Sequence, residues 1–539
     1  MAVDVQARLR RLSALKSART PHEYVWRDCF DHSFTMRGSG LQQNSLTASQ
    51  ALDKKSRIVD STATDAGTIL ASALQSGMTP ANSRWQALEV FGADDEGKRW
   101  LDLASENLHQ EIHNSNFDSI GLECHLDMVG AGWFVMFIDV DHEVGGLHFE
   151  GWPLAQCYPA TSKAGGLVDT MYRVYNLTVS QAYEFADKRG GQVSDIVSRK
   201  IDTDPDAMVE MLHYIGPRRG SVPGGKMSKN LPFESLHIET QSQHLVLESG
   251  FEEFPIVVPR WSVIPDTAYA VGPMFNVLPD VRELNELKRM DKAASEIAVM
   301  GMWIAEDDGV LNPRTIKVGA RKVIVANSVD SMKPLQTGAN WQLADTRIAQ
   351  LQSAIRKILM ADQLQPQGGP QMTATEIHAR VALMRQQLGP LFGRMQAEYL
   401  QGLVSRTFML GYRAGVFGQA PQSLAGKNFT IKYISPLAKS QKLEDVSSIQ
   451  QFNAAIAPVA AVKPEIMDNI DFDDQTRSLA EGLGIPMSGL RTREDVQALR
   501  QARSQQQAAA AQQAQQQQLT TMATQTALDT HKAQATAAA

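Results

Sequence analysis

The chain has 539 residues, 43% of them apolar and 21% charged, which suits two to four packing units of a soluble globular protein. Its formal net charge is −7. Proteins that hold DNA through its phosphates carry basic surfaces. The overall charge therefore argues against a firm DNA grip and favours a surface past which DNA would slide.

Three cysteines, Cys29, Cys124 and Cys157, lie far apart and form no C-x-x-C motif. This spacing argues against a disulfide framework and against a zinc site, and it fits a reducing compartment. The first sixteen residues lack the apolar core of a signal peptide, and the apolar stretch at 129–140 is too short to span a bilayer. We therefore expect a protein made in the cytoplasm, with no membrane partner, metal or cofactor.

Apolar residues at helical spacing predict three helices in the N-terminal part, over 7–19, 62–74 and 94–115. A polar Asn-Ser-Asn-Phe sequence at 114–117 ends the third of them. The apolar positions that we expect in this third helix are Trp100, Leu101, Leu103, Leu108 and Ile112.

The following segment favours strands and turns. Apolar runs of strand length predict strands at 133–140, 147–150, 156–158, 168–175, 208–215, 236–240 and 244–247. Thr178 is the expected cap of a short helix over 178–185. Because helices precede and follow the strands instead of alternating with them, we predict an antiparallel sheet in an α+β protein.

Two long helices with an insert between them are predicted next, over 277–300 and about 345–360. The insert at 303–326 contains glycines and a proline and ends in a strand-like run at 322–326, so it is not expected to be helical. The apolar positions of the second helix are Ile348, Leu351, Ile355, Ile358 and Leu359.

An uncharged loop at 363–370 leads into a further helix. Thr373 and Glu376 have the spacing of a capping box that opens this helix, which is expected to run to about residue 415. Gly389 and Pro390 fall within it, and a proline there removes a backbone hydrogen bond and forces a bend.

The C-terminal part divides into two compositions. Short helices are expected over 444–500, and the 39 residues from 501 to 539 contain 12 glutamines and 13 alanines. Such a low-complexity tail forms a helix when many copies stack, or is disordered when it is alone.

Three local motifs resemble ligand sites without completing them. Gly220 begins a match to seven positions of a phosphate-binding loop, but Met227 stands where magnesium needs a hydroxyl. Asp202–Asp206 begins like a calcium loop and then lacks its glycine and glutamate. His142 and His148 do not have the H-E-x-x-H spacing. We expect a hairpin loop, a solvated turn and exposed hairpin histidines instead.

Four segments carry a family pattern through their order and spacing. They are Gly272 to Asn285 (GPMFNVLPDVRELN), Met372 to Glu376 (MTATE), the helix from Trp100 to Phe117 and the element from Thr178 to Phe185. Over about residues 10–435 the sequence resembles the head-to-tail connectors, or portal proteins, of short-tailed bacteriophages. Ala270 departs from that pattern, which has a glycine there.

The resemblance implies a portal fold with an antiparallel-sheet wing, a two-helix stem, a clip insert, a long kinked helix and a helical crown or barrel. The expected segments are the wing at 1–265, the first stem helix at 266–300, the clip at 301–344, the second stem helix at 345–361, the channel loop at 362–372, the long kinked helix at 373–417, a return segment at 418–439, the crown at 440–500 and a barrel helix or disordered tail at 501–539.

The resemblance also implies a function and partners. Such proteins form a twelve-fold homo-oligomeric ring that serves as a conduit for double-stranded DNA at one capsid vertex of the virion, in genome packaging, retention and ejection. The implied partners are the terminase packaging motor, the major capsid and scaffolding proteins, and tail adaptor or nozzle proteins. Assembly takes place in the host cytoplasm, and no ATPase is expected because the motor supplies it.

Candidate channel residues follow from these expectations. The uncharged loop residues are Gln363, Gln365, Gln367, Gly368, Gly369 and Gln371, whose amides would contact phosphates without a strong electrostatic trap. The basic candidates are Arg282, Lys288, Arg289 and Lys292 on the first stem helix and Arg314, Lys317, Arg321 and Lys322 in the clip. For these cations, pairing with neighbouring groups and a DNA-facing role are equally open. The apolar face of the stem is expected to pack between subunits.

Two other functions remain open from the sequence. One is a ring-forming tail adaptor or internal virion protein, which need not have an insert between two long helices. The other is a metal-dependent nuclease, for which Asp139 and Asp141 are the tightest carboxylate pair. No serine, cysteine or glycine motif of a known enzyme class is present, so we expect no enzymatic activity.

Overall fold

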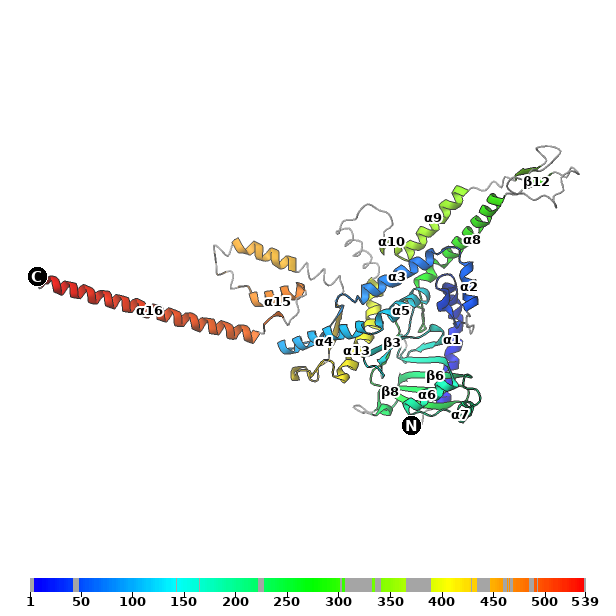
Figure 1. Ribbon diagram of the computed structural model, residues 1–539, viewed down its shortest axis with the longest axis horizontal. Helices are drawn as coiled ribbons and strands as arrows, with labels where there is room; N and C mark the ends of the chain where they lie inside the picture. The colour runs from blue at the N-terminus through cyan, green and yellow to red at the C-terminus, as the bar shows by residue number, and fades with distance from the viewer. Residues whose placement is uncertain are drawn as a thin grey trace. The chain divides into compact units, whose positions relative to one another are not determined.

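A computed structural model describes residues 4–41, 48–141, 143–163, 165–221, 227–300, 303–305, 332–334, 341–364, 389–427, 429–433, 446–458, 463, 465, 469–483, 489–491 and 493–537 (Figure 1). The chain forms two units. The first contains residues 1–85 and 108–416, and the second contains 86–107 and 417–539. Helices and antiparallel sheets occur together, which confirms the α+β class.

Helices open the first unit. The helix α1 runs over Val5–Asp31, and the Asp4 side chain caps it by accepting a hydrogen bond from the Ala7 amide at 2.9 Å. After the short helix α2 (Ala48–Arg57), α3 covers Thr62–Met78 and α5 covers Phe117–Ala131. The helices α1 and α3 are the two predicted over 7–19 and 62–74, although α1 is much longer than expected. The helices α2 and α5 were not predicted.

A five-stranded antiparallel sheet has its strands side by side in chain order. It consists of β4 (Cys157–Ala160), β5 (Thr170–Thr178), β6 (Met208–Pro217), β7 (Phe233–Glu239) and β8 (His244–Phe251). This confirms the predicted antiparallel sheet.

Smaller sheets lie in the same unit. A three-stranded sheet has the order β3 (Leu147–Gly151), β2 (Met136–Val140), β9 (Ile256–Val257), and a two-stranded one joins β10 (Ser262–Val263) to β11 (Ala270–Val271). The predicted strand at 133–140 is shorter than expected, because before Met136 only an isolated bridge forms, from Trp133 to Arg260.

The capped helix is also confirmed. The helix α6 covers Val179–Arg189, the Thr178 hydroxyl accepts from the Gln181 amide at 3.2 Å, and the Gln181 side chain accepts from the Thr178 amide at 3.0 Å. This reciprocal pair satisfies two amides that the helix leaves free. A short helix that the sequence did not predict, α7 (Asp195–Lys200), follows it.

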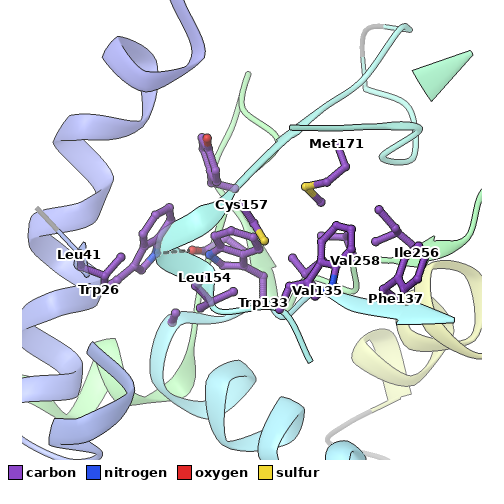
Figure 2. Packing of buried hydrophobic residues seen from close by; sticks show 14 of the residues in the cluster. Trp26, Leu41, Trp133, Val135, Phe137, Leu154, Cys157, Met171, Ile256 and Val258 are labelled. Carbon is purple, nitrogen blue, oxygen red and sulfur yellow. Dashed lines mark hydrogen bonds between the residues drawn. The ribbon is translucent and has the colours of Figure 1, made fainter. Parts of the chain in front are cut away.

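An aromatic core joins α1 to the sheets (Figure 2). Trp26 of α1 lies 5.4 Å from Trp133 and 5.2 Å from Tyr269, measured between ring centroids, and all three side chains are buried. The Trp26 indole donates a hydrogen bond to the Ala270 carbonyl at 2.9 Å, so its polar atom is satisfied inside the core. This contact fixes α1 next to the segment that leads into the next long helix.

The rest of the first unit is mainly helical. The helices are α8 (Pro273–Met300), α9 (Trp341–Ile358), α10 (Ala361–Leu364), α12 (Gly389–Met395) and α13 (Gln401–Ala414), and the short strands β12 (Trp303–Ala305) and β13 (Met332–Pro334) pair antiparallel. The helix α13 ends at Gly415, whose φ of 78° is the left-handed conformation of a helix C-cap.

The second unit has a two-stranded sheet and further helices. Strand β1 (Gln86–Glu89) pairs with β14 (Thr430–Tyr433), and α4 (Asp95–Asn114) begins here and ends in the first unit. The helices α15 (Phe472–Leu483) and α16 (Arg493–Ala537) follow a helical segment at 446–458. Leu103, one of the expected apolar positions of α4, is 57% exposed and so does not lie on the buried face of the helix.

The Gln/Ala-rich tail takes the helical form of the two that the sequence left open. The helix α16 has 45 residues, and its described side chains from 501 to 526 are all exposed. A helix of that length would extend about 67 Å at ~1.5 Å per residue. None of the helices in the described part of the chain combines the length and the apolarity that a bilayer crossing requires.

Candidate functional site

The two long helices α8 and α9 lie side by side and form a helical hairpin, with α3 packed against both (Figure 1). Gly272 and Pro273 precede and open α8; a proline at the first helical position costs no hydrogen bond, because the amide there has no partner within the helix. The helices predicted over 277–300 and about 345–360 correspond to α8 and α9, so both predictions are confirmed.

Five central apolar side chains of the hairpin are buried within the chain itself. Val277, Val281 and Leu284 of α8 are at most 1% exposed, and Leu351 and Ile355 of α9 are at most 4% exposed. For these residues the expectation of packing between subunits is wrong, because α3, α5 and the partner helix already cover them. For Ile297 and Met300, whose side chains lie outside the described part of the chain, it stays a prediction. Burial at this level stabilises the hairpin by about 1.5–3 kcal/mol for each large side chain.

Ile358 was expected in the same apolar face, and the structure corrects this. Its side chain is 39% exposed, whereas that of the next residue, Leu359, is fully buried. The helix α9 ends at Ile358, and Met360 adopts a left-handed backbone with φ of 58°. The turn out of the helix therefore directs Leu359 inward in place of Ile358.

Most of the described candidate cations have carboxylate partners within the chain. Arg282 pairs with Asp28 of α1, and Lys288 lies 2.8 Å from Asp60, a carboxylate next to α3. Arg289 pairs with Glu286 one turn earlier on the same helix. The four sequence-predicted stem cations thus divide into three with intrachain partners and Lys292, which lies on the exposed side of α8.

Two further arginines, on α9, form ion pairs within the hairpin and with α3. Arg347 lies 2.7 Å from Glu283 of α8, and Arg356 lies 3.4 Å from Asp65 of α3. Sequence reasoning missed these ion pairs, because their partners are separated by 64 and 291 residues and no local motif indicates them.

Comparison with known proteins decides the family. The family model for the bacteriophage head to tail connecting protein matches residues 5–490. The portal protein of Salmonella phage epsilon15 is 29% identical over 522 residues, covering 92% of this chain and 90% of that protein. The probable portal protein of Bordetella phage BPP-1 is 26% identical over 520 residues, with the same coverage. This chain belongs to the bacteriophage head-to-tail connecting protein family.

The candidate channel loop of this connecting protein lies mostly outside the described residues. Gln363 falls in α10, and Gln365, Gln367, Gly368, Gly369 and Gln371 lie beyond what the structure describes, as do Thr373 and Glu376 of the expected capping box. The clip cations Arg314, Lys317, Arg321 and Lys322 are outside it as well. Their roles stay predictions.

The expected kink lies at the edge of the described region. Gly389 and Pro390 begin α12, so a bend at that point stays a prediction.

Residues Gln396–Leu400 form a π-helical turn between α12 and α13. Within it, Glu398 meets Arg260 at 2.6 Å, and both side chains are 8% exposed. A π turn inserts one residue into the helix, and here it accompanies a buried ion pair.

The carboxylates of the nuclease alternative have structural partners. Asp139 lies 3.6 Å from Arg406, a buried arginine that also contacts Glu253 at 2.9 Å. The Asp141 carboxylate accepts hydrogen bonds from the amides of Glu143 and Val144 at 2.8 and 3.1 Å, which shapes the β2–β3 turn.

The motifs that resemble ligand sites are found on turns and loops. Asp202–Asp206 lies in exposed turns after α7. Met227 precedes a three-residue 3-10 turn that leads into β7, and residues 222–226 and His142 are outside the described residues. His148 is on β3 opposite Asp139.

The three cysteines are free and buried, and burial raises the pKa of the Cys29 and Cys157 thiols to about 12.

Proposed function

We propose that this connecting protein is a portal protein: a ring of identical subunits at one capsid vertex through which double-stranded DNA is packaged, retained and ejected. The family match over 5–490, together with two portal relatives that align over 92% of the chain, carries this proposal. We assign the helical hairpin of the first unit to the stem and its antiparallel sheet to the wing.

The remaining parts of the proposal follow from the family. We assign twelve subunits to the ring, the segment boundaries given in the sequence analysis, and the terminase motor, the capsid and scaffolding proteins and a tail adaptor as partners. Twelve copies at −7 each carry −84, which repels phosphate and keeps DNA mobile in the channel. The intrachain pairing of Arg282, Lys288 and Arg289 supports a stem that does not grip DNA.

Electron microscopy of the purified protein tests the ring. We expect closed rings with a central channel, because the connecting function at a capsid vertex requires a pore for DNA. Native mass measurement counts the subunits. A monodisperse 59.2 kDa monomer at every concentration, with no ring in the images, would contradict the proposal.

A charge substitution tests the channel loop. Gln365→Glu combined with Gln367→Glu adds 24 negative charges to a twelve-membered ring, and repulsion of phosphate is expected to lower the yield of DNA-filled particles by about tenfold. The matched control adds the same charges at exposed Gln110 and Gln241 and leaves the yield unchanged. Equal packaging and retention in both variants would show that the loop does not contact DNA.

A further inference from the structure

A buried carboxylate lies where α3 meets the α8–α9 hairpin. Asp60 precedes α3, and its side chain is 4% exposed. One oxygen accepts from the Thr62 amide at 2.8 Å. The other oxygen lies 2.8 Å from the Lys288 ammonium of α8. It also accepts a hydrogen bond from the side-chain amide of Gln352 of α9, again at 2.8 Å. A single carboxylate therefore contacts all three helices.

A neighbouring amide completes this junction. The side-chain oxygen of Asn285 accepts from the backbone amides of Val59 and Asp60 at 2.9 and 3.1 Å, and its nitrogen donates to the Val281 carbonyl at 2.9 Å. Asn285 is 6% exposed, so these bonds replace water at a buried site. The segment that precedes α3 is thus bonded directly to the middle of α8.

We propose that Asp60 is a positioning residue that fixes the stem hairpin at one orientation relative to the body of the subunit. This inference rests on the proposed function, because the hairpin is the stem only if the chain is a portal subunit. It assigns Lys288 and Gln352 to holding the stem in place. It also removes Lys288 from the set of DNA-facing cations.

The directionality of hydrogen bonds is the physical reason. Apolar packing between helices is non-directional and tolerates small slides, whereas charge-assisted bonds to one carboxylate require a particular distance and angle. Lys288 and Gln352 come from different stem helices and reach the same oxygen atom. A shift of either helix therefore breaks a bond and leaves a buried charge with fewer partners, which is strongly unfavourable.

The ion pairs that Arg347 and Arg356 form are weaker candidates for fixing the orientation of the hairpin. Arg347 and Glu283 are 50% and 44% exposed, and Asp65, the partner of Arg356, is 54% exposed. Ion pairs in such water-rich surroundings contribute little. Asp60 differs, because burial raises the pKa of its carboxyl while hydrogen bonds from Lys288, Thr62 and Gln352 outweigh burial and hold the pKa below its ordinary value. The carboxylate therefore stays charged at neutral pH.

The first experiment separates ring assembly from DNA handling. Lys288→Gln removes the charged partner from a partly exposed position, so folding and ring formation are expected to persist while the yield of DNA-filled heads falls by about tenfold, the effect of losing one charge-assisted bond. Lys288→Arg restores the yield. The matched control is Arg289→Gln, which removes an adjacent cation whose ion-pair partner is on the same helix and whose other contact is a 3.4 Å hydrogen bond to the Arg57 carbonyl; it leaves the yield unchanged.

A double-mutant cycle tests whether Asp60 is the shared partner. Lys288→Gln and Gln352→Ala are expected to be non-additive in the unfolding midpoint of the otherwise native chain. They become additive when Asp60→Asn is present, because the shared partner is gone. Additivity in both backgrounds, or an equal packaging loss in Arg289→Gln, would overturn the inference.

A distance measurement keeps the inference separate from the proposed function. Spin labels at exposed Thr68 of α3 and Gln350 of α9 report the orientation of the hairpin, and the three native cysteines are buried. We expect a narrow distance distribution that broadens in Lys288→Gln. An unchanged distribution overturns the role of Asp60 even if rings form. Absence of rings with a broadened distribution overturns the portal function alone.

Discussion

Replacing Gly132 with alanine is expected to destabilise the first unit by more than about 4 kcal/mol, a loss at the extreme of single substitutions. Gly132 ends α5 with φ of 90°, in the left-handed region. A Cβ atom there would lie 2.1 Å from the Val271 carbonyl carbon and 2.4 Å from the Gly272 nitrogen. Both neighbours are backbone atoms, so no side-chain rotation can relieve the clash.

The reason for this close approach is the crossing of two chain segments before α8. A Cβ atom at Gly272 would in turn lie 2.5 Å from the Val129 carbonyl oxygen, and the Gly132 carbonyl accepts from the Trp261 amide at 2.6 Å. The end of α5 is therefore in close contact with the segment that opens the α8–α9 hairpin. Only glycine permits both backbones to come this close.

A matched control separates the clash from ordinary backbone strain. Gly190 also ends a helix, with φ of 69°, but a Cβ atom there meets nothing within 4 Å. Gly190→Ala is expected to cost only about 1–2 kcal/mol, the strain of a left-handed alanine. Urea unfolding of both variants measures the difference. Equal losses would mean that the crossing is looser than the structure indicates.

The helices and strands with a clear apolar period could be predicted from the sequence, and others could not. The helix α5 was missed because nine of its residues are buried on several sides, including Phe117, Cys124 and Met128, and a helix buried all round has no amphipathic period. The short helices α2 and α7 give too few turns for a period to be recognised.

The partners of the basic residues on α8 could not be predicted from the sequence, for a different reason. The types and spacing of these basic residues are equally consistent with DNA contact and with ion pairing, and the choice depends on which carboxylates the fold brings near. Asp28 lies 254 residues from Arg282, and Asp60 lies 228 residues before Lys288. Only the packing of α1 and α3 against α8 reveals these partners. The buried pair of Arg260 and Glu398 was missed for the same reason.

Buried neutral histidines are expected to make the first unit acid-sensitive between about pH 6.5 and pH 4. His125 of α5 packs against the rings of Phe134 and Tyr399, and one of its ring nitrogens is 2.7 Å from the Gly121 carbonyl. Burial lowers the pKa of His125 to about 4. His237 is stacked on His213 at 3.9 Å between ring centroids, and burial lowers the pKa of His237 to about 3.

The sign follows from proton binding. Below pH 6.5 the unfolded chain protonates these rings, whereas the folded chain keeps His125 neutral until about pH 4. The unfolded state then binds more protons, so the free energy of unfolding decreases as the pH falls through this window and is fully retained above it. A shift from 6.5 to about 4 corresponds to about 3 kcal/mol for His125. The stacked pair of His213 and His237 lowers the free energy of unfolding further as the pH falls, because burial lowers the pKa of both rings.

The variant His125→Phe tests this account, because a phenyl ring fills the aromatic site and cannot be protonated. The free energy of unfolding of this variant should decrease less steeply between pH 6.5 and pH 4 than that of the native chain. Phe134→Leu is the matched control: it loosens the same contact but leaves the imidazole in place, so it lowers stability at every pH and keeps the native slope. If His125→Phe keeps the native slope as well, His125 is not the source of the acid sensitivity in this window, and the stacked pair of His213 and His237 is. Protonation of paired carboxylates such as Asp60 and Glu253 also lowers the free energy of unfolding, but only at lower pH.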